Sequence, residues 1–73
     1  MALHIVMDET GDTRHEFDAA DAKALRRAEA RFRELTGRGF RAVALHSGGT
    51  GTLQREFDPQ VERTLFVPQL LGG

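Results

Sequence analysis

Residues 3–7, near the start of the chain, are rich in β-branched and apolar side chains, and an alternating pattern of apolar and polar residues follows over residues 13–17. A period of two is the pattern of a half-buried β-strand. The segment between the two runs, Asp8–Asp12, is rich in turn-forming residues. The pattern therefore predicts a β-hairpin. Two sets of side chains compete for the buried face of its first strand: Leu3, Ile5 and Met7 on one side, and His4 and Val6 on the other.

The period changes to three and four residues in the next segment, which is the signature of an amphipathic helix. Leu25, Ala28, Phe32 and Leu35 share one apolar stripe. The N-cap is predicted at Asp18 or, one turn later, at Asp21, and Gly37 stands where a C-cap glycine belongs. These limits give a helix of roughly 16 to 18 residues.

Strand-like patterns return in the second half of the chain, over residues 40–45 and 53–57. The glycine-rich segment 46–52 separates them, which predicts a second hairpin. A last strand is predicted over residues 64–67, since Pro68 has no amide hydrogen to donate to a sheet.

The predicted order is ββαβββ, an α+β fold in which one helix covers a mixed sheet, and this is the plan of the β-grasp fold. We expect a domain over residues 1–68 and a flexible tail over residues 69–73. The predicted core of the domain consists of its larger apolar residues: Leu25, Phe32, Leu35, Val43, Leu45, Phe57, Leu65 and Val67.

Composition excludes several classes of function. At 73 residues the chain has room for a single small core, and it contains no cysteine, so disulfides and thiolate metal sites are excluded. A net charge of −1 and the absence of tryptophan and tyrosine argue against nucleic-acid binding. No apolar run approaches the roughly 20 residues that span a bilayer, and no signal peptide is recognised, so a cytoplasmic protein without membrane attachment is expected.

Four polar segments are candidates for other chemistry. Ser47 follows His46 but lacks an oriented acid, so catalysis by a serine nucleophile is not expected. The glycine-rich segment is interpreted as a turn, because a strand rather than a helix follows it. His4 and His15 are predicted cross-strand neighbours without a third ligand, so no metal site is expected. The stripe of Lys23, Arg27 and Arg31 is interpreted as a solvent-exposed face.

The chain ends in Gly72-Gly73, preceded by a strand that begins Thr64-Leu65, and its first predicted turn contains Thr10-Gly11. In these features it resembles the ubiquitin-like proteins, and the small, arginine-rich, cysteine-free chain resembles bacterial members of that family. Glycines without Cβ atoms allow a chain end to pass through a narrow channel. The resemblance implies a protein modifier, not an enzyme, whose Gly73 carboxylate is adenylated and passed through a thioester to a target amine, with formation of an isopeptide bond.

The resemblance also implies the partners: an adenylating enzyme that uses ATP, a conjugating enzyme, a deconjugating peptidase and target proteins. The modifier itself binds no cofactor. Recognition by the activating enzyme is expected at Gln69, Leu70 and Leu71. Ubiquitin has an arginine where Gln69 stands, so a dedicated activating enzyme is expected. Lys23, the single lysine, is the candidate acceptor for self-conjugation.

One alternative remains open from the sequence. Sulfur carriers of thiamine and molybdopterin biosynthesis also combine a β-grasp fold with a terminal Gly-Gly, and their activated carboxylate becomes a thiocarboxylate. The segment Phe66-Val67-Pro68 is similar to that group. A β-grasp interaction module without tail chemistry is the remaining possibility.

Overall fold

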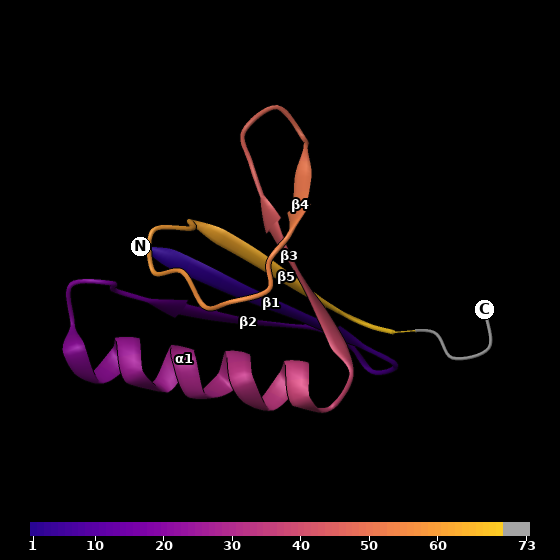
Figure 1. Ribbon diagram of the computed structural model, residues 1–73, viewed down its shortest axis with the longest axis horizontal. Helices are drawn as coiled ribbons and strands as arrows, with labels where there is room; N and C mark the ends of the chain where they lie inside the picture. The colour runs from indigo at the N-terminus through magenta and orange to yellow at the C-terminus, as the bar shows by residue number, and fades with distance from the viewer. Residues whose placement is uncertain (70–73) are drawn as a thin grey trace.

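The computed structural model describes residues 1–69. Its elements in chain order are β1 (Ala2–Asp8), β2 (Gly11–Phe17), α1 (Ala22–Gly37), β3 (Phe40–Leu45), β4 (Gly51–Leu53) and β5 (Arg63–Pro68). The helix packs on one face of a five-stranded mixed sheet, so this part of the chain is a two-layer α+β unit (Figure 1). Within residues 1–69, no helix has the length and apolar character needed to cross a membrane.

The sheet has the strand order β2-β1-β5-β3-β4. β1 and β5 are parallel, and all other neighbouring strands are antiparallel. A parallel pair needs a long crossover connection, and the helix with the second hairpin supplies it. As a result, the last strand in the sequence lies at the centre of the sheet, with a hydrogen-bonded neighbour on each side.

The helix begins at the later of the two predicted caps. The Asp21 carboxylate accepts hydrogen bonds from the backbone amides of Lys23 (3.0 Å) and Ala24 (3.4 Å), which satisfies two of the free donors at the helix start. The C-cap glycine was predicted at the wrong residue. Gly37 is the last helical residue, and the positive φ of 100° that reverses the chain belongs to Gly39.

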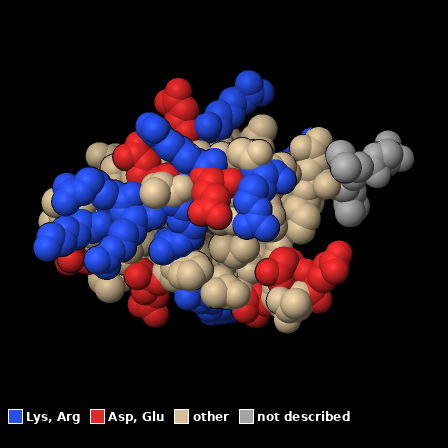
Figure 2. Space-filling model, turned by 90° about the horizontal axis from the view of Figure 1, so that it is seen from below, with Lys and Arg blue, Asp and Glu red and all other residues tan. Residues whose placement is uncertain are grey.

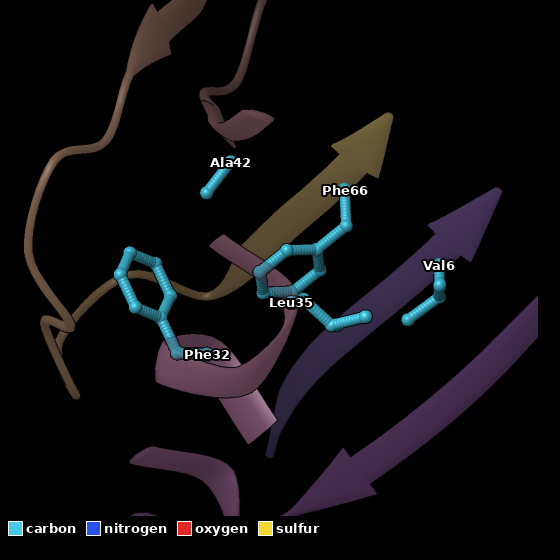
Figure 3. Close-up of a cluster of buried hydrophobic side chains, with 5 residues drawn as sticks. All are labelled: Val6, Phe32, Leu35, Ala42 and Phe66. Carbon is cyan, nitrogen blue, oxygen red and sulfur yellow. The ribbon is translucent and has the colours of Figure 1, made fainter. Parts of the chain in front are cut away.

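The core lies between α1 and the sheet. Phe66 of β5 is fully buried, and its ring meets that of Phe32 of the helix edge to face, with ring centres 5.7 Å apart (Figure 3). Ala42 of β3 lies opposite Phe66 in register and is also buried. The other buried apolar side chains are Ala2, Val6, Phe17, Ala28, Leu35 and Ala44.

Half of the predicted core was assigned to the wrong sheet face. Val43 and Leu45 of β3, with Leu65 and Val67 of β5, point away from the helix and are only half-buried. Their neighbours in sequence occupy the helix-covered face instead. The pattern did not decide between the faces, since β3 is apolar at four consecutive positions, 42–45. Leu25, from the helix stripe, and Phe57, from the segment after β4, were also predicted in the core and are partly buried against it.

The segment between β4 and β5 is irregular, and β4 ends at Leu53 rather than continuing to Phe57 as predicted. A buried polar pair holds this segment to the sheet: the Thr64 hydroxyl donates to the Gln54 side-chain oxygen at 2.9 Å. The Gln54 side-chain nitrogen donates in turn to the Glu56 carbonyl at 3.0 Å. Because these polar atoms are paired, their burial costs little.

Candidate functional site

The position where the chain leaves the sheet is the first candidate site. Pro68, the last residue of β5, is paired with Phe40, the first residue of β3. One residue later, the Gln69 amide donates to the Gly39 carbonyl at 3.2 Å. The main chain is therefore attached to the fold up to residue 69, beside the C-terminal end of α1.

A cation lies next to this exit. The Arg38 guanidinium lies 5.9 Å from the centre of the Phe40 ring, within the range of a cation–π contact, and 3.8 Å from the Glu34 carboxylate. Arg38, Gly39, Phe40, Pro68 and Gln69 together line a shallow hollow. No local pattern predicted a place for Arg38 at the chain exit, because Pro68 and Gln69 lie beside it only through the pairing of β3 with β5.

The structure places two of the residues predicted to act in conjugation and recognition. Gln69 is exposed at the exit, and Lys23 is exposed in the first turn of α1. The helix begins at one end of the long axis and the chain leaves β5 at the other (Figure 1). Lys23 is therefore remote from the exit of its own chain. The remaining predicted residues, Leu70, Leu71, Gly72 and Gly73, lie outside the described residues.

The second candidate site is the sheet face opposite the helix. The register places aliphatic side chains from four strands on this face, several of them half-buried and two of them largely exposed. They are Leu3, Ile5, Met7, Val43, Leu45, Leu53, Leu65 and Val67. Met7 retains 43% of its exposure and Leu53 retains 50%, although both are large apolar residues. We refer to these eight side chains as the open-face patch.

Arginines lie around the open-face patch. Arg14 is paired with Ile5, Arg41 with Val67 and Arg63 with Leu45, and paired residues on neighbouring strands share a face. All three arginines are exposed. An apolar surface with a charged rim is the composition expected of a protein-binding surface.

A buried histidine is the main electrostatic feature of the covered face. His4 is 2% exposed, and its ring packs edge-on against Phe17 and Phe66. Burial lowers the pKa of His4 to about 4, with smaller contributions from the charges of Arg31 and His15. His4 is therefore neutral at pH 7. Arg31 can only donate, so the contact of 3.4 Å between Arg31 Nη1 and His4 Nδ1 assigns the ring proton to Nε2.

The other polar clusters behave as structural elements. His4 and His15 are directly opposite in the first hairpin, as predicted. Residues 1–69 contain no group of three side chains able to hold a metal ion. His46 pairs with the Thr52 hydroxyl at 3.0 Å, and positive φ angles at Gly48 and Gly49 form the turn before β4. The glycine-rich segment is thus a turn between strands, as expected.

Comparison of the chain with protein-family models, curated proteins and solved structures finds no match. The functional argument therefore rests on the residues and on the geometry of the two candidate sites.

Proposed function

We propose that the chain is a ubiquitin-like protein modifier of β-grasp architecture, whose Gly73 carboxylate is activated by a partner enzyme and joined to an amine of a target protein. One observation carries the proposal: β5, which leads directly into the sequence Gln69–Gly73, is the central strand of the sheet. A segment attached to a central strand starts from a fixed point on a rigid body. This geometry suits a protein that presents its chain end to other active sites.

The attachment at Gln69 supports this assignment. The Pro68–Phe40 pairing and the hydrogen bond from Gln69 to Gly39 fix the chain four residues before Gly73. Four extended residues span at most about 14 Å. An enzyme that binds the folded body near the exit would thus find the Gly73 carboxylate within a limited radius.

The proposed chemistry has three steps, all catalysed by partners. A carboxylate oxygen of Gly73 attacks the α-phosphorus of ATP and releases pyrophosphate. A cysteine thiolate of the activating enzyme then attacks the acyl-adenylate and releases AMP, which leaves a thioester. A target lysine amine attacks the thioester, the thiol leaves, and an isopeptide bond remains.

The body of the domain offers two features for recognition by the activating enzyme. The open-face patch supplies apolar area that is exposed to solvent, and Arg38 supplies a charge beside the chain exit. The segment Gln69-Leu70-Leu71 is uncharged in sequence. We infer that the enzyme binds the folded domain through the open-face patch and accepts the end of the chain in an apolar channel.

The test is ATP–pyrophosphate exchange with a ubiquitin-type activating enzyme of the native host. Deletion of Gly72 and Gly73 is expected to abolish exchange, while the melting temperature stays within about 2 °C, because neither residue contributes to the described core. Gly73→Ala is expected to slow transfer, since its methyl group crowds a channel shaped for glycine. Gly37→Ala, at a helix position with no atom near the added Cβ, is the matched control and should exchange normally. Exchange at wild-type rate by the truncated protein would eliminate the proposal.

Self-conjugation is expected to be limited. Lys23 is the single lysine, so only its ε-amine and the amino group of Met1 can accept a second modifier. Extensive polymers that survive Lys23→Arg and do not run through Met1 would contradict an amine acceptor.

A further inference from the structure

Residues 23–31 of α1 carry four basic side chains close together: Lys23, Arg26, Arg27 and Arg31. Figure 2 shows this concentration of positive charge at the end of the molecule where the helix begins. Lys23, Arg26 and Arg27 are exposed, and Arg31 is half-buried. We refer to these four residues as the basic patch. The proposed function gives the patch no role beyond the acceptor amine of Lys23.

The basic patch lacks ion-pair partners in the described residues. The three salt bridges within residues 1–69 join Arg14 to Asp12, Arg33 to Glu29, and Arg38 to Glu34. The two helical carboxylates therefore pair with Arg33, in the C-terminal half of α1, and with Arg38, at its C-cap. At the helix start, the Asp21 carboxylate accepts from backbone amides. The charges of the patch are left to solvent or to a partner.

The charges at the two ends of α1 follow the helix dipole, but the basic patch does not. The N-terminus of a helix favours negative charge and its C-terminus favours positive charge, and here the Asp21 carboxylate is the N-cap and Arg38 is the C-cap. Within the helix, however, the first turn contains no acidic residue, and Lys23, Arg26 and Arg27 all lie in the N-terminal half. Interaction with the helix dipole therefore does not explain the basic patch, whereas a role in binding an anionic partner does.

One member of the patch is held in position by the fold. Arg31 lies 3.4 Å from the ring of buried His4, a neutral partner that leaves the positive charge of the guanidinium uncompensated. Lys23, Arg27 and Arg31 recur every four residues along one side of the helix, over about 12 Å. This stripe matches two turns of a helix that carries acidic residues at the same spacing.

The remaining surface favours a protein over a nucleic acid. Phe17, Phe32 and Phe66 are buried, and the other two phenylalanines are partly buried against the core, so the described residues offer no exposed phenylalanine ring for base stacking. Small side chains lie between the basic ones, including exposed Ala30, and permit close approach of a partner backbone.

We propose that the basic patch is a docking surface for an acidic, helical segment of a partner protein. The proposal is independent of the chemistry at Gly73. It adds a second interaction site, on the opposite layer of the domain from the open-face patch.

The test uses the full chain labelled with ¹⁵N and a synthetic 14-residue helix-forming peptide with glutamate at every fourth position. The same peptide with glutamine at those positions is the control ligand. Amide shifts are expected to change over residues 23–31 with the glutamate peptide and to stay unchanged with the glutamine peptide. Arg26→Gln/Arg27→Gln should weaken binding roughly three- to tenfold, as expected for the loss of two exposed ion pairs.

The matched control is Arg33→Gln/Arg38→Gln, which removes two positive charges from the same helix but from residues already paired with glutamates. Less than twofold weakening is expected. Equal weakening by both double variants would overturn the proposal, because it would show a response to net charge alone. Tighter binding of a 12-nucleotide single-stranded RNA than of the peptide would overturn it in favour of nucleic acid. Self-association that sedimentation detects in the wild type and that Arg26→Gln/Arg27→Gln abolishes would overturn it in favour of a second copy.

Discussion

The two faces of the sheet are built from different kinds of apolar side chain. The face under α1 combines small residues, such as Ala42 and Ala44, with the aromatic rings of Phe17 and Phe66. The open face carries branched aliphatic residues of intermediate size, which remain partly exposed. Hydrophobicity alone therefore does not identify the core of this sheet. The buried face is the one whose side chains fit against the helix.

The physical reason lies in the distance between the layers. Alanines on β3 let the helix approach the sheet, and rings from β2, α1 and β5 then fill the remaining volume edge to face. Larger side chains at the alanine positions would push the helix away. On the open face nothing in the described residues covers the sheet, so side-chain size there is not limited by a second layer.

The largest expected difference in stability is between substitutions at two adjacent residues of β5, Phe66 and Val67. Phe66→Ala should lower the free energy of unfolding by about 3 to 5 kcal/mol, because it removes a fully buried ring. Val67→Ala, on the open face, should cost about 1 kcal/mol. Urea unfolding at pH 7.5 measures both. If Phe66→Ala does not fold, Phe66→Leu takes its place in the comparison and should still be less stable than Val67→Ala. Equal costs at the two positions would show that the faces do not differ.

A second pair tests the small residues of β3. Ala42→Leu should cost about 1 to 3 kcal/mol, because Ala42 is 1% exposed and the added atoms must displace the helix. Val43→Leu, one residue along the strand and on the open face, should change stability by less than about 0.5 kcal/mol. Thermal unfolding followed by circular dichroism is sufficient. A neutral Ala42→Leu would mean that the layers are not closely packed there.

The third prediction uses the buried histidine of the covered face. The folded-state pKa of His4, about 4, lies below its unfolded value of about 6.5, so the unfolded chain binds the proton more readily. The stability that His4 contributes is present above pH 6.5 and is lost as the pH falls toward 4. Between pH 7.5 and 5.0 the loss should be about 2 kcal/mol.

His4→Gln should lack this component, whereas His46→Gln, which replaces an exposed histidine, should retain it. Carboxylates titrate in all three proteins and largely cancel in the comparison. Parallel stability profiles for wild type and His4→Gln, from urea unfolding at each pH, would show that His4 titrates normally.

The smallest effect on stability is expected from a polar substitution on the open face. Leu65→Ser should cost about 1 kcal/mol, since the residue is only half-buried. It should nevertheless slow ATP–pyrophosphate exchange, because the open-face patch is the proposed surface for the activating enzyme. Arg55→Ser, on the irregular segment after β4, is the control. If folded Leu65→Ser supports exchange at the wild-type rate, the activating enzyme does not recognise the open-face patch.

Sequence patterns predicted the elements better than the faces. The cap at Asp21, the strand at residues 40–45 and the first hairpin were confirmed because local signals specify them: a side-chain oxygen at a helix start, a β-rich run and a glycine turn. The face of β3 was assigned wrongly because four apolar residues follow one another over 42–45, although exposed Arg41 shares a period-two face with Val43 and Leu45. Packing against a helix distant in sequence decided it.

The candidate sites show the same contrast between features that local sequence predicts and features that only the fold reveals. Lys23 is exposed, as its place on the solvent-facing side of the helix predicted. Gln69 is also exposed, and its role in recognition stays a prediction. Arg38 came to the chain exit only through pairing of β3 with β5, which no local pattern reveals. Three residues of the basic patch could be recognised in the sequence as a stripe. That the patch has no ion-pair partner within residues 1–69 could be seen only from the side-chain positions.

The central claim, that Gly73 is joined to target amines, is tested most directly by mass spectrometry of tryptic peptides from the native host. Arg63 is the last basic residue, so trypsin leaves residues 64–73 attached to a modified lysine. The account predicts target peptides carrying this ten-residue remnant, Thr64-Leu65-Phe66-Val67-Pro68-Gln69-Leu70-Leu71-Gly72-Gly73, and their loss when Gly72 and Gly73 are deleted. A host sample without the remnant, in which the protein instead ends in a thiocarboxylate at Gly73 or continues beyond it, would contradict the claim.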